Sequence, residues 1–187
     1  MTEVTTIYDR FTALTKRAIV GARDAAVYLG HDFIGTEHLL MGLAQTAGLA
    51  SEALRAHGAE LTALRSEAAL AMNARGVPAT HGQAAADALS TLGIDVGEIR
   101  RRADASFGAG SFQFPRPAFS LSAKRAVKAS LEQARAAGQE VIDTEHLLLG
   151  VLATEDDPAI QVLTSLGIDV AALRQTVLSR GPSTPSA

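Results

Sequence analysis

Hydrophobic residues recur every three or four positions near the start of the chain, which is the spacing of one face of an α-helix. The stripe consists of Phe11, Leu14, Ala18, Ala22, Ala26 and Leu29. Charged residues such as Lys16 and Arg17 fall on the other side. Gly30 follows the last apolar position, where a glycine commonly closes a helix. The pattern therefore predicts an amphipathic helix that ends at Gly30.

The same pattern returns later in the chain at a constant offset. Thr36-Glu37-His38-Leu39-Leu40 is repeated unchanged as Thr144-Glu145-His146-Leu147-Leu148. At the same offset the flanks match without a gap in the pairs Phe11 and Phe119, Gly30 and Gly138, Ile34 and Ile142, and Gly42 and Gly150. Self-similarity over this length indicates a duplicated structural unit.

The repeated segment predicts the start of a helix in each copy. Thr36 and Thr144 are placed to act as N-caps, with each hydroxyl accepting a backbone N–H of the first turn. Glu37 and Glu145 would complement the positive end of the helix dipole. The leucines that follow are expected to face the core, because burying one leucine contributes roughly 1.5–3 kcal/mol against ~1 kcal/mol for a cap.

Each copy is expected to continue with two shorter helices, at 50–72 in the first and 158–180 in the second. The segment 88–96 also resembles 162–170, at a shorter offset than that of the main repeat. Residues 83–107 could therefore supply the last two helices of the first copy. We favour 50–72, because it follows the preceding helix without a long loop.

These elements predict an all-α fold, a pseudo-twofold duplicated four-helix repeat of about eight helices with an extra helical hairpin inserted between the copies. The expected parts of this single domain, residues 8–180, are repeat one at 8–72, an inserted helical segment and linker at 73–118, and repeat two at 119–180. An N-terminal extension at 1–7 precedes the domain. A tail at 181–187, rich in proline and serine, is expected to be disordered.

Four phenylalanines crowd the linker between the copies, namely Phe107, Phe112, Phe114 and Phe119. We favour a role in sealing the linker onto the helices. An apolar cluster in a loop could also form a surface for a partner.

Composition removes several classes of function. The 187 residues carry a formal net charge of −3, which argues against a general nucleic-acid binder. The absence of cysteine excludes disulfides and thiolate metal sites. No apolar stretch approaches the ~20 residues of a membrane span, and the N-terminus does not read as a signal peptide. A cytoplasmic protein without membrane contact is expected.

Candidate catalytic chemistry is sparse. The chain has no G-x-x-x-x-G-K-[ST] sequence, so no phosphate-binding loop for ATP is predicted. His38 and His146 are lone histidines in a first helical turn, without H-E-x-x-H spacing. His31, His57 and His81 lie near predicted loops and are interpreted as solvated. We therefore expect no metal, no cofactor and no enzymatic activity.

The pattern as a whole resembles the Clp N-terminal domain, also called the Clp repeat domain. The resemblance rests on Tyr8-Asp9-Arg10-Phe11-Thr12, on Lys16-Arg17, on the run from Phe33 to Leu43 and on the second copy. It looks closest to the ClpC type and extends from Tyr8 to about Arg180 except for the additional segment. In that family the domain precedes ATPase modules, which this sequence lacks. The resemblance implies a non-catalytic recognition module whose partners are Clp ATPase or protease components, their substrates or their adaptors.

The resemblance also implies a specific ligand. ClpC-type domains recognise phosphorylated arginine with the start of the second helix in each repeat, which here gives Thr36, Glu37, Thr144 and Glu145 as site residues. A helix N-terminus attracts a phosphoryl group and a carboxylate pairs with a guanidinium, so the chemistry is coherent. Gly35 would permit close approach in the first copy, whereas Asp143 would repel a phosphate in the second. The alternative is that both segments act only as helix starts.

A second functional interpretation uses a different surface. The family binds peptide or cyclic-peptide ligands on the first helix, which here corresponds to Tyr8, Lys16, Ile19 and Val20. The chain would then be a decoy that sequesters peptides or cyclic-peptide antibiotics directed at the unfoldase. We favour the other interpretation, in which the recognition module is an adaptor or regulator of Clp-dependent proteolysis.

Overall fold

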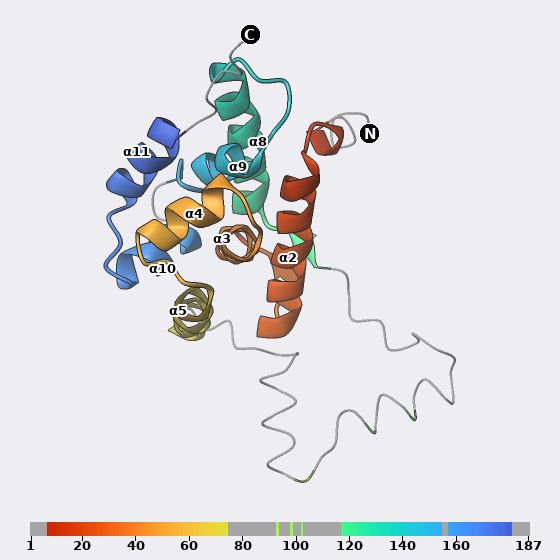
Figure 1. The fold of residues 1–187 in the computed structure, drawn as a ribbon. Helices are drawn as coiled ribbons and strands as arrows, with labels where there is room; N and C mark the ends of the chain where they lie inside the picture. Colours follow the sequence, from red (N-terminus) through yellow and green to blue (C-terminus); the bar gives the residue numbers. More distant parts are fainter. Residues whose placement is uncertain are drawn as a thin grey trace.

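The computed structural model describes residues 7–74, 117–154 and 157–180, together with Gly93, Glu98 and Arg102. The first group of helices in these residues is α2 (Ala13–Leu29), α3 (Thr36–Gln45), α4 (Leu49–Ala56) and α5 (Leu61–Ala74). The second group is α8 (Leu121–Ala136), α9 (Thr144–Val151), α10 (Pro158–Ser165) and α11 (Val170–Arg180). The all-α prediction is confirmed, with one short parallel pairing of β1 (Phe33–Ile34) and β2 (Ala118–Phe119) (Figure 1).

Several sequence predictions fall outside these residues. They concern the hairpin at 83–107 apart from Gly93, Glu98 and Arg102, the phenylalanines of the linker other than Phe119, and the tail at 181–187. Segment 50–72 does form the third and fourth helices of the first group, as α4 and α5.

The first helix of each group begins at a hydroxyl cap, and α2 ends at Gly30 as the sequence predicts. Thr12 caps α2 by accepting a hydrogen bond from the N–H of Thr15 at 3.2 Å. Ser120, its counterpart in the second copy, caps α8 in the same way through the N–H of Ala123 at 3.1 Å. Gly30 adopts the left-handed conformation, with φ of 75°, at the end of α2. Both amphipathic helices are thus fixed by local signals at their ends.

Small residues let the first two helices of each group approach closely. A Cβ at Gly42 of α3 would overlap the carbonyl of Ala18 and lie 2.7 Å from the nitrogen of Ala22, both in α2. A Cβ at Gly150 of α9 would likewise lie 2.8 Å from the nitrogen of Ser130 in α8. Glycine is therefore required at both positions for the helices to pack backbone against backbone.

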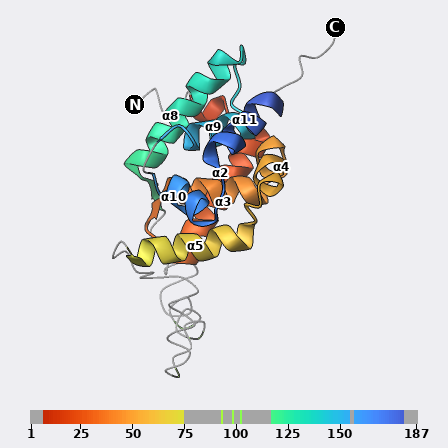
Figure 2. The ribbon, with the colours of Figure 1, turned by 90° about the vertical axis from the view of Figure 1, so that its left-hand side faces the viewer.

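The two groups interlock through their remaining helices. The pair α5 and α10 are in contact, as are α4 and α11, so the short helices of one group pack on those of the other (Figures 1 and 2). Helix α3 also packs against α10, and α9 against α4. One continuous set of buried side chains results, and it includes Leu39, Leu54, Leu147 and Leu163.

Backbone pairs tie the starts of the groups together. Ile34 pairs with Phe119, and Phe11 pairs with Ile142, both in parallel. The N–H of Ser120 donates to the carbonyl of Ile34 at 2.9 Å, and the N–H of Thr12 donates to that of Ile142 at 3.1 Å. In the repeat, Phe119 is the counterpart of Phe11, and Ile142 is that of Ile34. The duplication in sequence is therefore a duplication of contacts.

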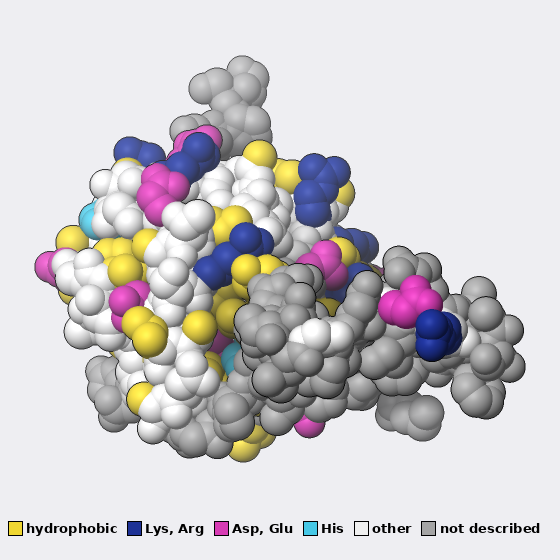
Figure 3. All heavy atoms as spheres, turned by 90° about the horizontal axis from the view of Figure 1, so that it is seen from below, with side chains coloured by type: hydrophobic (Ala, Val, Ile, Leu, Met, Phe, Trp, Pro, Cys, Tyr) yellow, Lys and Arg dark blue, Asp and Glu magenta, His cyan; other side chains and the backbone are white. Residues whose placement is uncertain are grey.

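The described surface has mixed character. In the face that Figure 3 shows, hydrophobic, basic and acidic side chains are interspersed, and neither charge covers it continuously. Among the described helices, none has the length and apolar character needed to cross a bilayer.

Candidate functional site

Helices α3 and α9 start at the threonines of the repeated segment, so the N-caps are the residues before them. These are Gly35 and Asp143, and the prediction that Thr36 and Thr144 act as caps is wrong. A histidine of the first turn reaches back instead. His38 Nδ1 accepts the N–H of Gly35 at 2.9 Å. The corresponding imidazole of the second copy accepts the N–H of Asp143 at 3.0 Å.

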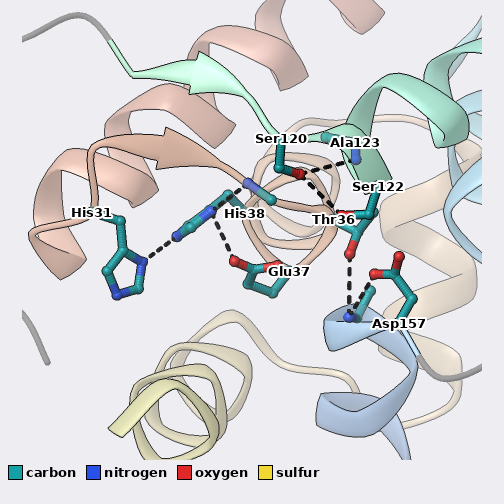
Figure 4. Close-up of polar contacts among 10 residues, drawn as sticks. His31, Thr36, Glu37, His38, Ser120, Ser122, Ala123 and Asp157 are labelled. Carbon is teal, nitrogen blue, oxygen red and sulfur yellow. Dashed lines mark hydrogen bonds and ion pairs between the residues drawn. The ribbon is translucent and has the colours of Figure 1, made fainter. Parts of the chain in front are cut away.

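The threonine side chains serve contacts between the two groups of helices. Thr36 Oγ1 accepts a hydrogen bond of 3.4 Å from the N–H of Ala159, which Asp157 Oδ1 also approaches at 3.4 Å (Figure 4). Thr144 Oγ1 lies against Gly48, 2.9 Å from the position that a Cβ there would take. Each threonine thus touches the start of the third helix of the other group. Both threonine side chains are buried, and a buried hydroxyl group needs a hydrogen-bond partner.

The glutamates of the segment are buried as well. Glu37 is only 1% exposed, and its carboxylate occupies the space that a Cβ at Gly35 would fill. The space that glycine opens therefore holds Glu37 itself. Glu145 is 8% exposed, and its Oε2 accepts the hydroxyl of Thr144 at 3.4 Å. A ligand would reach the four predicted phosphoarginine residues only after the start of α3 or α9 became exposed.

Beside Glu37 lies a pair of histidines that the sequence did not predict to meet. His31 Nδ1 and His38 Nε2 are 2.8 Å apart, and Glu37 Oε1 lies 3.1 Å from His38 Nδ1 (Figure 4). His31 is buried, with its ring stacked on Phe33 at 5.5 Å, so its interpretation as a solvated residue is wrong. Burial and the neighbouring His31 lower the pKa of His38 to about 3. Burial also lowers the pKa of His31, against the opposing charge of Asp32.

The hydrogen bond from Gly35 indicates which nitrogen of His38 carries the proton. His38 is neutral near pH 7, and its Nδ1 accepts the Gly35 N–H, so its single proton is on Nε2. His38 therefore donates to His31 Nδ1. A neutral His38 does not form an ion pair of full charges with Glu37. The two side chains are nevertheless in contact, with His38 Nδ1 3.1 Å from Glu37 Oε1.

The signal that could have identified this cluster is a departure from the repeat. Gln139 stands in the second copy where His31 stands in the first, so only the first copy has a histidine at this point. The second copy keeps His146, whose pKa is lowered by burial although Glu145 and Asp143 act in the opposite direction. His57 lies elsewhere, with Nε2 2.8 Å from the Thr176 hydroxyl.

Three of the four residues expected on the first-helix surface are accessible. Tyr8 is 46% exposed and Val20 is 42% exposed. Lys16 Nζ lies over the Tyr8 ring, 5.4 Å from its centre, and Val20 follows one helical turn later. Ile19 is only 8% exposed and belongs to the core. Tyr8, Lys16 and Val20 are called the α2 surface below.

Comparison with known proteins identifies the family to which both copies of the repeat are similar. Residues 10–84 and 118–186 match the Clp repeat (R) N-terminal domain, leaving 85–117 between the two matched stretches. The chain is 28% identical over 172 residues to chaperone protein ClpB of Oceanobacillus iheyensis. It is 30% identical over 177 residues to the chloroplastic chaperone protein ClpC1 of Arabidopsis thaliana. These matches cover 92% and 94% of this chain but only 17% and 15% of the relatives.

Solved structures agree in fold. The N-terminal domain of ClpD from Arabidopsis thaliana matches with a TM-score of 0.61 at 22% identity, over 92% of this chain and 98% of that one. The Hsp104 N-terminal domain from Candida albicans matches with a TM-score of 0.59 at 14% identity, over 92% and 93%. Since the sequence match extends over both copies of the repeat, this chain belongs to the family of the Clp repeat (R) N-terminal domain.

Proposed function

We propose that the chain is a non-catalytic module that recognises polypeptides and acts as an adaptor or regulator of Clp-dependent proteolysis. The observation that carries the proposal is the match of residues 10–84 and 118–186 to the Clp repeat domain, which in the relatives occupies about a sixth of a longer protein. Those relatives include ClpC/MecB of Bacillus subtilis, named a negative regulator of genetic competence. A module of this family is expected to bring other proteins to an unfoldase.

The α2 surface supports recognition of a polypeptide. Tyr8 offers an aromatic face, Lys16 a cation held over that face, and Val20 an aliphatic contact one turn away. Aromatic side chains with a polar end are enriched at protein interfaces because they bury a large area and still accept polar partners. The three residues would bind an extended segment with an apolar side chain and an acidic group.

The experiment measures binding of the purified chain to a purified ClpC-type unfoldase and the rate at which unfoldase and protease degrade a model substrate. We expect binding, and a changed degradation rate when the chain is added. Tyr8→Ala with Val20→Asp should weaken binding at least tenfold. Tyr28→Ala is the matched control, because Tyr28 is an equally exposed tyrosine, near the end of α2, but lies against Arg65. Absence of binding, or equal loss in both variants, would contradict the proposal.

The same α2 surface supports a decoy as the second candidate. A cyclic peptide with apolar side chains would fit an exposed aromatic and aliphatic pair. At a ligand concentration of 100 Kd, binding would add ~2.7 kcal/mol to the free energy of unfolding. A decoy should restore degradation only when a cyclic-peptide inhibitor is present, whereas an adaptor should change degradation without it. The two candidates are thereby separated in one assay.

Recognition of phosphoarginine is a finer proposal for Thr36, Glu37, Thr144 and Glu145. Its support is the repeated threonine and glutamate at two helix starts, where N–H groups favour an anion and a carboxylate favours a guanidinium. Because these side chains are buried, binding has to be coupled to exposure of α3 or α9. Titration with phosphoarginine should show saturable binding that Glu37→Gln weakens and the exposed-site variant Glu52→Gln leaves unchanged. No binding by the unmodified chain would remove this proposal.

A further inference from the structure

Helix α8 carries a line of exposed positive charge on the side that faces away from the core. The helix packs against α9, with smaller contacts to α3 and β2, and it lies along one edge of the group of helices (Figure 2). Its buried side consists of the small residues Ala123, Ala126, Ser130 and Ala134. The opposite side recurs three or four positions apart and is exposed throughout. It is called the α8 stripe below and consists of Leu121, Lys124, Arg125, Lys128, Glu132 and Arg135.

The positive charges of the α8 stripe have no partner within the described part of the chain. None of its four cations takes part there in an ion pair, a side-chain hydrogen bond or a cation–π contact. With four cations and one carboxylate, that of Glu132, the stripe has a net charge of +3, whereas the whole chain has a formal net charge of −3. Like charges on one helix face repel one another. An acidic partner would relieve this repulsion.

The first copy of the repeat lacks such a stripe. At the constant offset of the repeat, Val20 and Val27 of α2 stand where Lys128 and Arg135 stand in α8. The two additional cations are therefore a feature of the second copy and not of the repeated unit. For the same reason the α8 stripe differs in chemistry from the α2 surface.

An exposed apolar side chain begins the stripe. Leu121 is 65% exposed, more than any other large hydrophobic residue that the structure describes. It precedes Lys124 by three positions and Arg125 by four, so it lies beside them on the helix. From Leu121 to Arg135 the stripe is ~21 Å long, at the rise of an α-helix. An extended segment of about six or seven residues would cover this length.

We propose that the α8 stripe binds an acidic segment of another polypeptide. An apolar side chain of that segment packs on Leu121, and the carboxylates that follow it pair with Lys124, Arg125 and Lys128. A polypeptide fits this surface better than a nucleic acid, because affinity for nucleic acids comes from many phosphate contacts and the chain as a whole is acidic. The proposal does not depend on binding to an unfoldase, so either can fail without the other.

The experiment is a titration, followed by fluorescence anisotropy, of a labelled twelve-residue peptide that has one leucine followed by four glutamates. We expect saturable binding to the full chain, weakened when NaCl is raised from about 0.05 to about 0.3 M, since salt screens exposed charges. Lys124→Glu with Lys128→Glu should weaken binding at least tenfold. The control is Arg55→Glu with Arg180→Glu, which changes the net charge equally at exposed positions of α4 and α11. Circular dichroism reports whether each variant is folded.

A second peptide, with serine in place of its leucine, tests the apolar contact. Leu121→Ser should weaken binding of the first peptide at least threefold and leave binding of the second unchanged, as expected for two groups in direct contact. The proposal is overturned if the first peptide does not bind at the lower salt concentration, or if the control pair loses as much affinity as the pair in α8. It is also overturned if a DNA duplex binds as tightly as the peptide, or if Leu121→Ser affects both peptides equally.

Discussion

Ile142 lies beside Phe11 in a parallel bridge that joins the second group of helices to the first. The equivalent residues Ile34 and Phe119 form the matching pair. Ile142 is fully buried, whereas its neighbour Val141 is 49% exposed. The side chain of Ile142 thus fills space at the junction of the two halves of the protein.

Ile142→Ala should lower the free energy of unfolding by about 2–5 kcal/mol, because it removes buried atoms and leaves a cavity. Val141→Ala, at the adjacent exposed position, should change it by no more than about 0.5 kcal/mol. Urea denaturation followed by circular dichroism measures both. Equal effects of the two substitutions would show that the junction is not part of the core.

Gly42→Ala should destabilise the chain by about 1–3 kcal/mol, since the new methyl group would press on the backbone of α2 at Ala18 and Ala22. Glycine to alanine within an unconstrained helix would instead stabilise by about 1 kcal/mol. The sign of the change therefore tests the close approach directly. Gly150→Ala should behave alike, and Lys124→Ala on the exposed side of α8 should be nearly neutral. The same urea titration serves for all three.

Thr36→Val should lower the free energy of unfolding by about 1 kcal/mol, because the N–H of Ala159 loses one of its acceptors while the side-chain volume is kept. Thr164→Val in α10 is the control. Its hydroxyl donates to the carbonyl of Ile160 within α10, in an exposed position, so its loss leaves no buried N–H without an acceptor. Thermal unfolding of the two variants gives the comparison, and a larger loss for Thr164→Val would contradict the role of Thr36 between the halves.

Acidification should destabilise the chain. The pKa of His38 is lowered to about 3 and that of His146 is lowered as well, both mainly by burial. Between pH 6.5 and 5 the unfolded chain therefore binds protons that the folded chain does not, so stability falls as pH falls. Each such histidine contributes a loss of up to about 1.4 kcal/mol per pH unit.

Urea midpoints at pH 7.5, 6 and 5 measure this slope. Only the interval above pH 5 is diagnostic, because carboxylates titrate below it. A flat dependence between pH 7 and 5 would show that these histidines are not held neutral in the folded protein.

The sequence was sufficient for features that depend on local spacing. The stripe from Phe11 to Leu29 and the stop at Gly30 predicted α2, and the constant offset of the repeat predicted a matching α8. Choosing 50–72 over 83–107 rested on the short connection to α3, and α4 with α5 confirms that segment as helical. Caps and periodicity act over a few residues, so one sequence contains them.

Contacts between distant residues could not be predicted in this way. Thr36 read as a cap because threonine favours that position, but His38 takes the N–H of Gly35 and frees Thr36 to meet Ala159. The sequence suggests that Gly35 leaves space for a ligand, but in the folded chain the Glu37 carboxylate fills that space. His31 and His38 are on either side of a connector, and only the folded chain turns them toward one another.

The exchange of helix contacts, with α5 on α10 and α11 on α4, has a consequence for the origin of the molecule. A polypeptide consisting of one repeat would carry both complementary faces, so two identical copies could cover each other around a twofold axis. Gene fusion of such a homodimer would turn an intermolecular interface into an intramolecular one. After fusion the two copies no longer need to remain identical, which would leave position 31 free to become histidine while position 139 became glutamine.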